Sequence, residues 1–250
     1  MFRIFLVQLK NNFTRQIMYR SNFLTLLLVD ITWMAIEMLF FDALYAHNAS
    51  IAGWSKTQTY FFLGLFFTSD AIFTVFLQRN FWSFSDLVNQ GELDIFLLKP
   101  ANPVFLILTR FMNISSITNI PLGLWIMNHY GNITLSTPFW ALYGVLIACL
   151  LRFTFSIVVF WTDRGQSLSR FYYQLFPFAT KPDTIYPSPL RLILRTILPF
   201  ACIGSVPARA LLGMLEPHEY ILIIMVPIAF FVLNTALWKK GLKRYQSASS

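Results

Sequence analysis

The sequence RNFWSFSDLVNQGELDIFLLKPANP, residues 79–103, interrupts an otherwise apolar chain. It is the longest run between apolar segments that combines acids, amides, glycine and proline. Apolar side chains recur at roughly helical spacing before Gly91 and again after it, until Pro100 and Pro103. This pattern predicts either short helices set across the ends of longer ones or a solvated connector with some buried aromatic residues.

The composition around this stretch is that of a polytopic membrane protein. Of the 250 residues, 56% are hydrophobic and 12% are charged, and the mean hydropathy is +0.59. A soluble domain carries about 25% charged residues. Since about 20 apolar residues are needed to cross ~30 Å of hydrocarbon, the length allows roughly five to seven spans and no sizeable soluble domain.

Several classes of function do not fit the chain. The net charge of +8 comes from basic residues scattered between apolar spans, where they act as topology signals, so we expect no nucleic-acid partner. No motif for nucleotide binding, metal binding or nucleophilic catalysis is present, so we expect neither a catalytic residue nor a metal. Cys149 and Cys202 both lie in apolar surroundings and suggest no disulfide framework.

The predicted architecture is a single all-α permease domain, residues 1–250. Residues 1–20 separate apolar from polar side chains at a period of 3.6 and predict an amphipathic interfacial helix. We expect six spans, at residues 23–45, 57–77, 104–127, 139–161, 165–179 and 220–238. Hydropathy alone would place the fifth at residues 190–212, but the arginines and prolines there favour a short, polar, buried span at 165–179, and either division gives six crossings. Residues 80–103 form the loop between spans two and three. The prolines and arginines of 183–214 predict a re-entrant hairpin, which needs protein or a water-filled cavity around it.

Six crossings place both termini on one side of the membrane. With the N-terminus inside, eleven of the nineteen Lys and Arg residues are cytoplasmic: Arg3, Lys10, Arg15, Arg20, Arg79, Lys99, Arg164, Lys239, Lys240, Lys243 and Arg244. The positive-inside rule therefore predicts cytoplasmic termini and a cytoplasmic 80–103 loop. Four basic residues of the re-entrant region oppose this topology: Lys181, Arg191, Arg195 and Arg209.

Charged residues inside the predicted spans are candidate functional residues. From a rise of about 1.5 Å per residue, Asp30, Asp70 and Arg152 lie at similar depth, about 10–13 Å above the inner ends of their spans. Glu37 shares a helix face with Asp30. Two interpretations stay open, because intramembrane charges face protein or water. These four residues line a translocation path that favours cationic amphiphiles, or an internal ion pair such as Asp70 with Arg152 fixes helix packing.

Four segments together resemble one family. GELDIFLLKPANP, residues 91–103, is similar to the G-x-L-D-x-x-L-L-[RK]-P-x-x-P signature of ABC-2 type permeases, in the subfamily formerly of unknown function. Phe160 and Trp161 match its FW motif, and Trp238, Gly241, Leu242 and Tyr245 match its W-x-x-G-L-x-x-Y motif. Residues 176–213 resemble its proline-rich segment, with Leu198 in place of isoleucine.

The resemblance implies the permease subunit of an ATP-binding cassette (ABC) exporter in the bacterial inner membrane. Two ATP-binding subunits, which hold ATP and Mg, would pair with two permeases, so this chain needs no cofactor. The residues implied to contact the ATPase are Ser83, Phe84, Asp86, Leu87, Val88, Asn89, Gln90, Gly91, Glu92, Leu93 and Asp94. The outer gate would include Tyr186, Pro187, Pro199 and Pro207. Residues 180–182 favour one partner of a heterodimer, although a homodimer stays open.

Two other classes give different expectations. An ATP-independent secondary transporter or channel would use the intramembrane acids as relays and tends to show two similar halves, and we find no internal repeat. A membrane-embedded lipid enzyme would need a cluster of His, Asp or metal ligands at the interface, which the sequence lacks.

Overall fold

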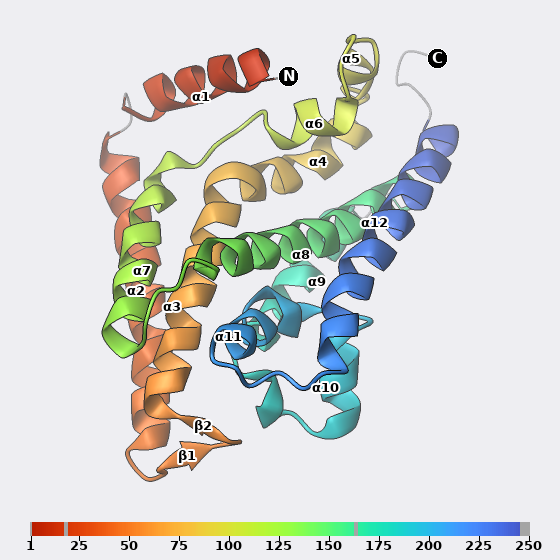
Figure 1. The fold of residues 1–250 in the computed structure, drawn as a ribbon. Coiled ribbons are helices and arrows are strands. Elements are labelled where there is room, and N and C mark those ends of the chain that lie inside the picture. The colour runs from red at the N-terminus through yellow and green to blue at the C-terminus, as the bar shows by residue number, and fades with distance from the viewer. Residues whose placement is uncertain (1, 18–19, 163–164, 246–250) are drawn as a thin grey trace.

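The computed structural model describes residues 2–17, 20–162 and 165–245, which form an α-helical protein with one small β-hairpin (Figure 1). The α-helices are α1 (Phe2–Ile17), α2 (Arg20–Tyr45), α3 (Lys56–Phe73), α4 (Arg79–Asn89), α5 (Asp94–Leu97), α6 (Pro103–Leu108), α7 (Asn119–Tyr130), α8 (Thr137–Ile157), α9 (Gly165–Leu175), α10 (Ser188–Arg195), α11 (Ser205–Leu211) and α12 (Glu219–Arg244). The strands are β1 (Ser50–Ile51) and β2 (Trp54–Ser55). Shorter elements are the π-helix η1 (Thr74–Gln78) and the 3-10 helices η2 (Ile114–Thr118), η3 (Val158–Phe160), η4 (Phe176–Phe178), η5 (Asp183–Ile185) and η6 (Phe200–Ile203). Residues 18–19 of the predicted interfacial helix, and Arg164, lie outside the described residues.

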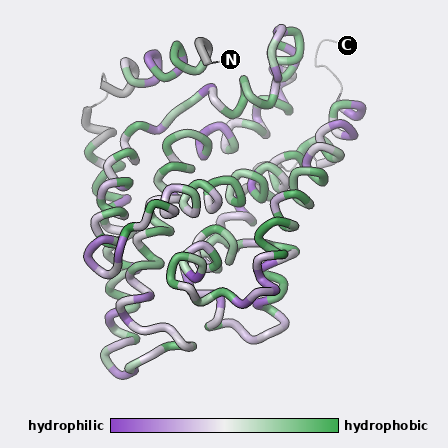
Figure 2. Tube along the Cα trace, viewed as in Figure 1, coloured by the Kyte–Doolittle hydropathy of each residue, from purple (hydrophilic) through white to green (hydrophobic). Residues whose placement is uncertain are grey.

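In the part of the chain that the structure describes, four helical segments are long and apolar enough to cross a membrane: 24–45, 56–89, 137–160 and 219–244. They correspond to four of the six predicted spans, and Figure 2 shows hydrophobic residues along them. The chain buries 72% of the most apolar window of 56–89 but only 11% of that of α2 and 22% of that of α12. α3 is therefore the central helix, and α2 and α12 turn large apolar faces outward.

Small residues let the helices around α3 approach closely. A Cβ added at Gly123 of α7 would lie 2.4 Å from Oγ1 of Thr68, and one at Gly64 of α3 would lie 2.7 Å from Cγ of Met127. A Cβ at Gly144 of α8 would lie 2.3 Å from the carbonyl oxygen of Ile203. Glycines at such contacts are typical of membrane helix packing.

The second predicted span ends too early. The helix runs on from α3 through η1 into α4 and ends only near Gly91, which has a φ of 74°. No glycine or proline occurs between Gly64 and Gly91, so nothing in the backbone stops the helix at the predicted residue 77. The π-turn bends the helix, and α4 crosses the end of α3 (Figure 1). Residues 80–89 are therefore helical, and only the segment after them is a connection.

The third predicted span, 104–127, is not a continuous helix. α6 ends at Leu108, residues 109–113 have no regular structure, and α7 begins only after the short helix η2. Hydrogen bonds from a buried side chain hold the break open. Asn80 donates to the carbonyl oxygens of Leu108 (2.7 Å) and Phe111 (2.8 Å) and accepts a bond from the N–H of Phe111 (2.8 Å). These side-chain bonds replace helical ones.

The predicted span at 165–179 is also shorter than expected. α9 has 11 residues, and Pro177 lies in the 3-10 turn that follows it. At about 1.5 Å per residue, such a helix covers roughly half of the hydrocarbon thickness. The next segment, 183–214, contains the short helices α10 and α11, separated at Pro199 and η6.

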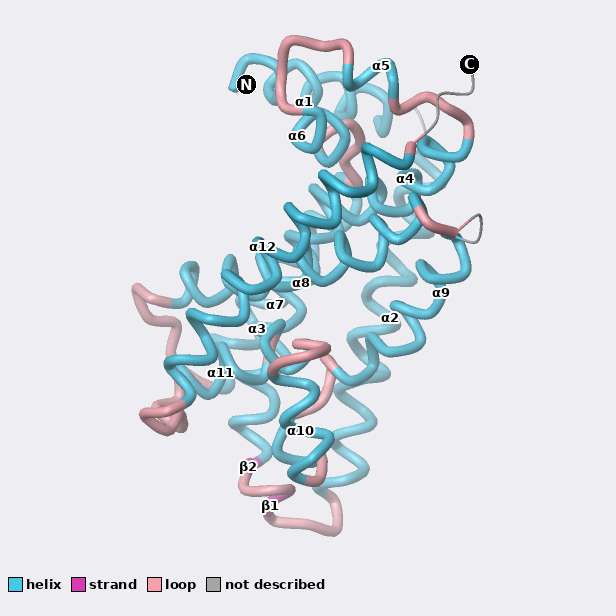
Figure 3. The backbone as a smooth tube through the Cα atoms, turned by 90° about the vertical axis from the view of Figure 1, so that its right-hand side faces the viewer, coloured by secondary structure: helices cyan, strands magenta, loops and turns pink. Residues whose placement is uncertain are grey.

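The two ends of the molecule differ in what they contain. α1, α5, α6 and the C-terminal turns of α12 lie at one end, and the β1–β2 hairpin lies at the opposite end near α10 (Figures 1 and 3). α1 lies across the end of the helix bundle, and its Phe5 ring is 6.3 Å from that of Phe76. At the other end, Ser55 and Gln58 form a capping box that starts α3.

Candidate functional site

The residues implied to contact an ATPase divide into buried and exposed groups. Phe84, Leu87, Val88 and Leu93 are at most 8% exposed, so their side chains hold the 79–103 segment against the rest of the chain. Asn89 and Gln90 are exposed. The apolar side chains open to a partner lie just beyond the predicted set: Ile95 is 56% exposed and Leu98 is 86% exposed. We call residues 89–99 the loop tip.

An aromatic cluster fixes one face of α4. We define the Phe84 cluster as Phe84, Phe153, Phe160, Trp238 and Tyr245. The Phe84 ring lies 6.1 Å from Phe160 and 6.2 Å from Trp238, and Phe160 lies 5.7 Å from Trp238 and 6.2 Å from Tyr245. The cluster therefore joins α4, α8, η3 and α12, and it includes residues of two of the sequence motifs.

A buried arginine contacts α4 at Trp82. Arg152 of α8 is fully buried, and its guanidinium carbon lies 5.7 Å from the Trp82 ring, 4.9 Å from Tyr172 and 5.0 Å from Tyr173. Trp82 in turn stacks on Tyr173 at 4.8 Å. Contacts of this kind place a cation against aromatic faces. They connect α4 to both α8 and α9.

Asn80 is a functional candidate that the sequence analysis missed. It is 1% exposed and, besides its bonds to the break in the third predicted span, donates to the carbonyl of Phe76. Asn12 of α1 donates to the carbonyl of Arg110 in the same break (3.2 Å). The signal in the sequence was an asparagine next to the predicted helix end at residue 77. Its hydrogen-bond partners, however, are about 30 residues away along the chain.

Replacing Asn80 with alanine should destabilise the protein. The change leaves three carbonyls and one N–H without the Asn80 partner, and each buried unsatisfied group costs about 1–3 kcal/mol. We expect a lower unfolding temperature of the purified chain in a thermal scan. The control is Asn89→Ala, an exposed residue at the end of the same helix. Equal melting of the two variants would contradict the bracing role of Asn80.

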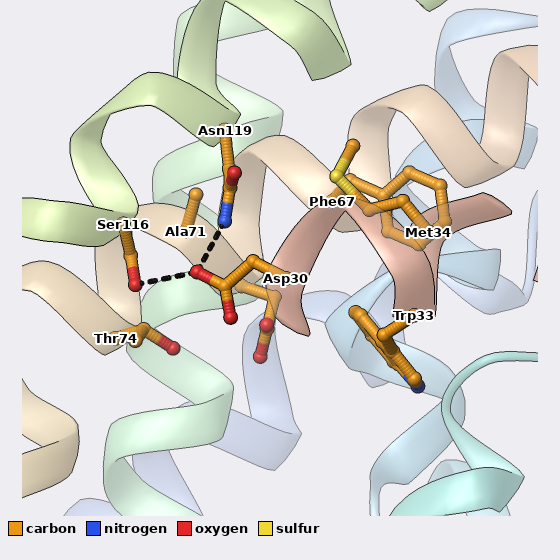
Figure 4. Close-up of a pocket in the computed structure, with 9 residues that line it drawn as sticks. Asp30, Trp33, Met34, Phe67, Ala71, Thr74, Ser116 and Asn119 are labelled. Carbon is orange, nitrogen blue, oxygen red and sulfur yellow. Dashed lines mark hydrogen bonds between the residues drawn. The ribbon is translucent and has the colours of Figure 1, made fainter. Parts of the chain in front are cut away.

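Two of the predicted intramembrane acids line one small cavity. Asp30 of α2 and Asp70 of α3 share it with Ser116 and Asn119, and its volume is about 20 Å³. Asp30 Oδ2 accepts hydrogen bonds from Ser116 Oγ (2.9 Å) and from Asn119 Nδ2 (2.7 Å), as Figure 4 shows. The break in the third predicted span brings Ser116 and Asn119 to this place.

The other two predicted path residues lie elsewhere. Glu37 forms an ion pair with Lys181, and Arg152 lies among the aromatic rings of α4 and α9. The four residues therefore do not form one acidic wall. The alternative, an ion pair of Asp70 with Arg152, is not among the ion pairs formed by the described residues.

A buried group of four charges, which the sequence analysis did not find, joins the segment 183–214 to α12. We call Asp183, Arg195, Arg209 and Glu219 the four-charge cluster. Arg195 binds Asp183 and also Glu219, the latter at 2.6 Å, and Arg209 binds Glu219 at 2.7 Å. Ser205 Oγ donates to Asp183 Oδ1 (2.6 Å). The two carboxylates and two guanidiniums balance in charge, which is the condition for burying them.

The predicted outer-gate residues lie between Asp183 and Glu219 in the sequence, and they differ in exposure. Pro199 and Pro207 are buried, Tyr186 is partly buried and Pro187 is exposed. The Tyr186 ring lies 5.4 Å from Phe178, and burial raises the pKa of Tyr186 to about 12, so its hydroxyl is neutral at physiological pH. Among the described residues, no group of three or more His, Cys, Asp or Glu is placed to hold a metal ion.

Comparison with known proteins gives the class and the family. The apolar helices make the chain a membrane protein of the transporter-permease type. Residues 31–249 match the ABC-2 family transporter protein, and the chain therefore belongs to this family. Comparison with curated proteins and with solved structures finds no match in either set. The predicted resemblance is confirmed, and it covers all but the first 30 residues and the last one.

Proposed function

We propose that the chain is the permease subunit of an ABC exporter, in which it forms the path and couples it to ATP hydrolysis by a separate subunit. The Phe84 cluster is the observation that supports this function best. Its rings pack α4 against the spans α8 and α12. The loop tip follows directly at the C-terminal end of α4. A push on the tip would therefore reach two spanning helices through packed rings.

The partner that supplies the push is an ATP-binding cassette subunit, present in two copies with ATP and Mg. Its contact surface on this chain is the loop tip, with the exposed residues Asn89, Gln90, Ile95 and Leu98. The buried side chains of Phe84, Leu87 and Val88 act one step further in, because they hold α4 in position.

A second permease completes the assembly. α2 and α12 expose most of their apolar surface, which lipid and a second permease would cover together. That second chain is either a related permease or another copy of this one. Because the Asp30–Asp70 cavity of about 20 Å³ is too small for an organic cargo, we place the path of a hydrophobic or amphiphilic compound along the α2 surface.

The proposed orientation is with both termini in the cytoplasm of a bacterium, and the chain in its inner membrane. The four basic residues that opposed this orientation all have structural partners. Lys181 binds Glu37, Arg195 and Arg209 belong to the four-charge cluster, and Arg191 donates to the carbonyls of Thr184 (2.8 Å) and Tyr186 (3.0 Å). The orientation therefore rests on the excess of Lys and Arg on the cytoplasmic side, because the positive-inside rule counts basic residues and not net charge. The segment 183–214 then forms the outer gate, which the four-charge cluster stiffens.

Replacing Leu98 with aspartate should separate the permease from its ATPase. Leu98 is 86% exposed on the loop tip, so the change adds a charge to the proposed contact without opening the protein's core. The core of a protein interface is depleted in charged residues, so we expect loss of ATPase co-purification and of ATP-dependent efflux in vesicles. The control is Leu135→Asp, at a residue that is 100% exposed in the connection between α7 and α8. Retained co-purification in Leu98→Asp would overturn the docking surface, and efflux without any ATPase would overturn the proposed function.

A further inference from the structure

The cavity between α2, α3 and the start of α7 carries features of an ion site that the proposed export function does not use. Its lining includes two carboxylates, Asp30 and Asp70, and the polar groups of Thr74, Ser116 and Asn119. No Lys or Arg of the described residues forms an ion pair with either carboxylate. Intramembrane acids without a basic partner leave negative charge in a region where charge is costly.

Asn119 gives a second and independent observation. Its side chain is 7% exposed and lines the cavity, and its amide group points toward Asp30 in Figure 4. The Nδ2 atom donates to Asp30, whereas the buried Oδ1 atom has no hydrogen-bond partner among the described residues. A buried carbonyl oxygen without a donor costs free energy, which a bound cation would recover.

The backbone at this place is of the kind that forms ion sites in transporters. The third predicted span is interrupted between α6 and α7, and the segment that replaces helix there carries Ser116 and precedes Asn119. Interrupted helices near the middle of a membrane supply oxygen ligands to coupling ions in other transport proteins. The two hydrogen bonds to Asp30 both use Oδ2, so neither of them occupies Oδ1.

We propose that this cavity binds one Na⁺ ion, with ligands from the Asp30 and Asp70 carboxylates, Asn119 Oδ1 and a hydroxyl of Thr74 or Ser116. The ligands are all oxygen, which suits a hard cation. A volume of about 20 Å³ suits about one ion or water. Ca²⁺ takes about 6–8 oxygen ligands and Mg²⁺ usually keeps several waters, so both fit this cavity less well than Na⁺.

The test is equilibrium binding of radioactive ²²Na⁺ to the full chain purified in lipid nanodiscs, with choline chloride as the balancing salt. We expect saturable binding of one ion per chain, and loss of that binding in Asp70→Asn and in Asp30→Asn, both of which preserve side-chain shape. The control is Asp42→Asn, since Asp42 is partly exposed on α2 and pairs with Lys56 outside the cavity. The unfolding temperature in choline chloride shows whether each variant is folded.

The outcomes separate this inference from the proposed function, because the assay contains neither nucleotide nor ATPase. Saturable binding that both cavity variants lose and Asp42→Asn keeps would support the site. Absence of Na⁺ binding in the unmodified chain, or equal binding in a folded Asp70→Asn, would overturn it. Stronger competition by K⁺ or Ca²⁺ than by unlabelled Na⁺ would overturn the assignment to Na⁺. A response to pH alone, with no response to Na⁺, would replace the metal ion with a proton.

Discussion

Arg209→Met should be among the most destabilising single substitutions in this chain. Arg209 is 6% exposed and contacts Glu219 through two nitrogen atoms, and it donates a further bond to the carbonyl of Met214 (3.0 Å). Its removal leaves two carboxylates with one guanidinium in a buried place. Breaking a buried ion pair on one side costs about 3–5 kcal/mol, so we expect a clearly lower unfolding temperature and low protein yield.

A second substitution tests whether charge imbalance is the cause. In Arg209→Met with Glu219→Gln, the remaining Asp183 and Arg195 form a balanced pair, so part of the lost stability should return. Arg191→Met is the control, because Arg191 donates to backbone carbonyls and pairs with no carboxylate among the described residues. If the double variant is no more stable than the single one, loss of packing rather than unbalanced charge explains the effect.

The sequence predicted those parts of the fold that one segment determines alone. α2 and α12 are long apolar runs, and α12 stays helical through Pro227, so hydropathy located both of them, although α12 continues past the predicted residue 238 to Arg244. The end of the second span depended on the absence of a helix breaker before Gly91, which hydropathy does not register. The break after Leu108 depended on Asn80, whose hydrogen bonds compete with the helix from another element.

The candidate sites show the same limit. The sequence identified Asp30, Asp70 and the 79–103 segment from charge and spacing, but not which side chains turn outward. The family resemblance implied that Leu87 and Val88 contact the ATPase, yet both side chains are buried in the chain's own core. The four-charge cluster combines residues 183, 195, 209 and 219, and only the folded chain shows that Glu219 lies beside Arg195 and Arg209.

Phe84→Ala should uncouple ATP hydrolysis from the translocation path, while the permease and the ATPase subunit stay bound to each other. Phe84 is 1% exposed and contacts Phe153, Phe160 and Trp238, so its removal opens a space at the centre of the Phe84 cluster. A buried Phe→Ala change costs about 3–5 kcal/mol. Because the loop tip keeps its exposed residues, we expect co-purification with the ATPase to persist. Loss of a typical coupling free energy of about 1–3 kcal/mol would lower ATP-dependent efflux by roughly 5- to 150-fold.

The comparison that decides this prediction uses three variants in one vesicle assay of efflux and ATP hydrolysis. Phe84→Leu keeps most of the side-chain volume and should keep most of the efflux, since conservative apolar replacements are tolerated best. Phe139→Ala removes the same atoms from a residue that is 61% exposed at the start of α8, and should leave efflux unchanged. Hydrolysis that continues without efflux in Phe84→Ala alone would show that the cluster transmits the movement. Proportional loss of hydrolysis and efflux would instead mean that the cluster serves stability only, and α4 would then have no special part in coupling.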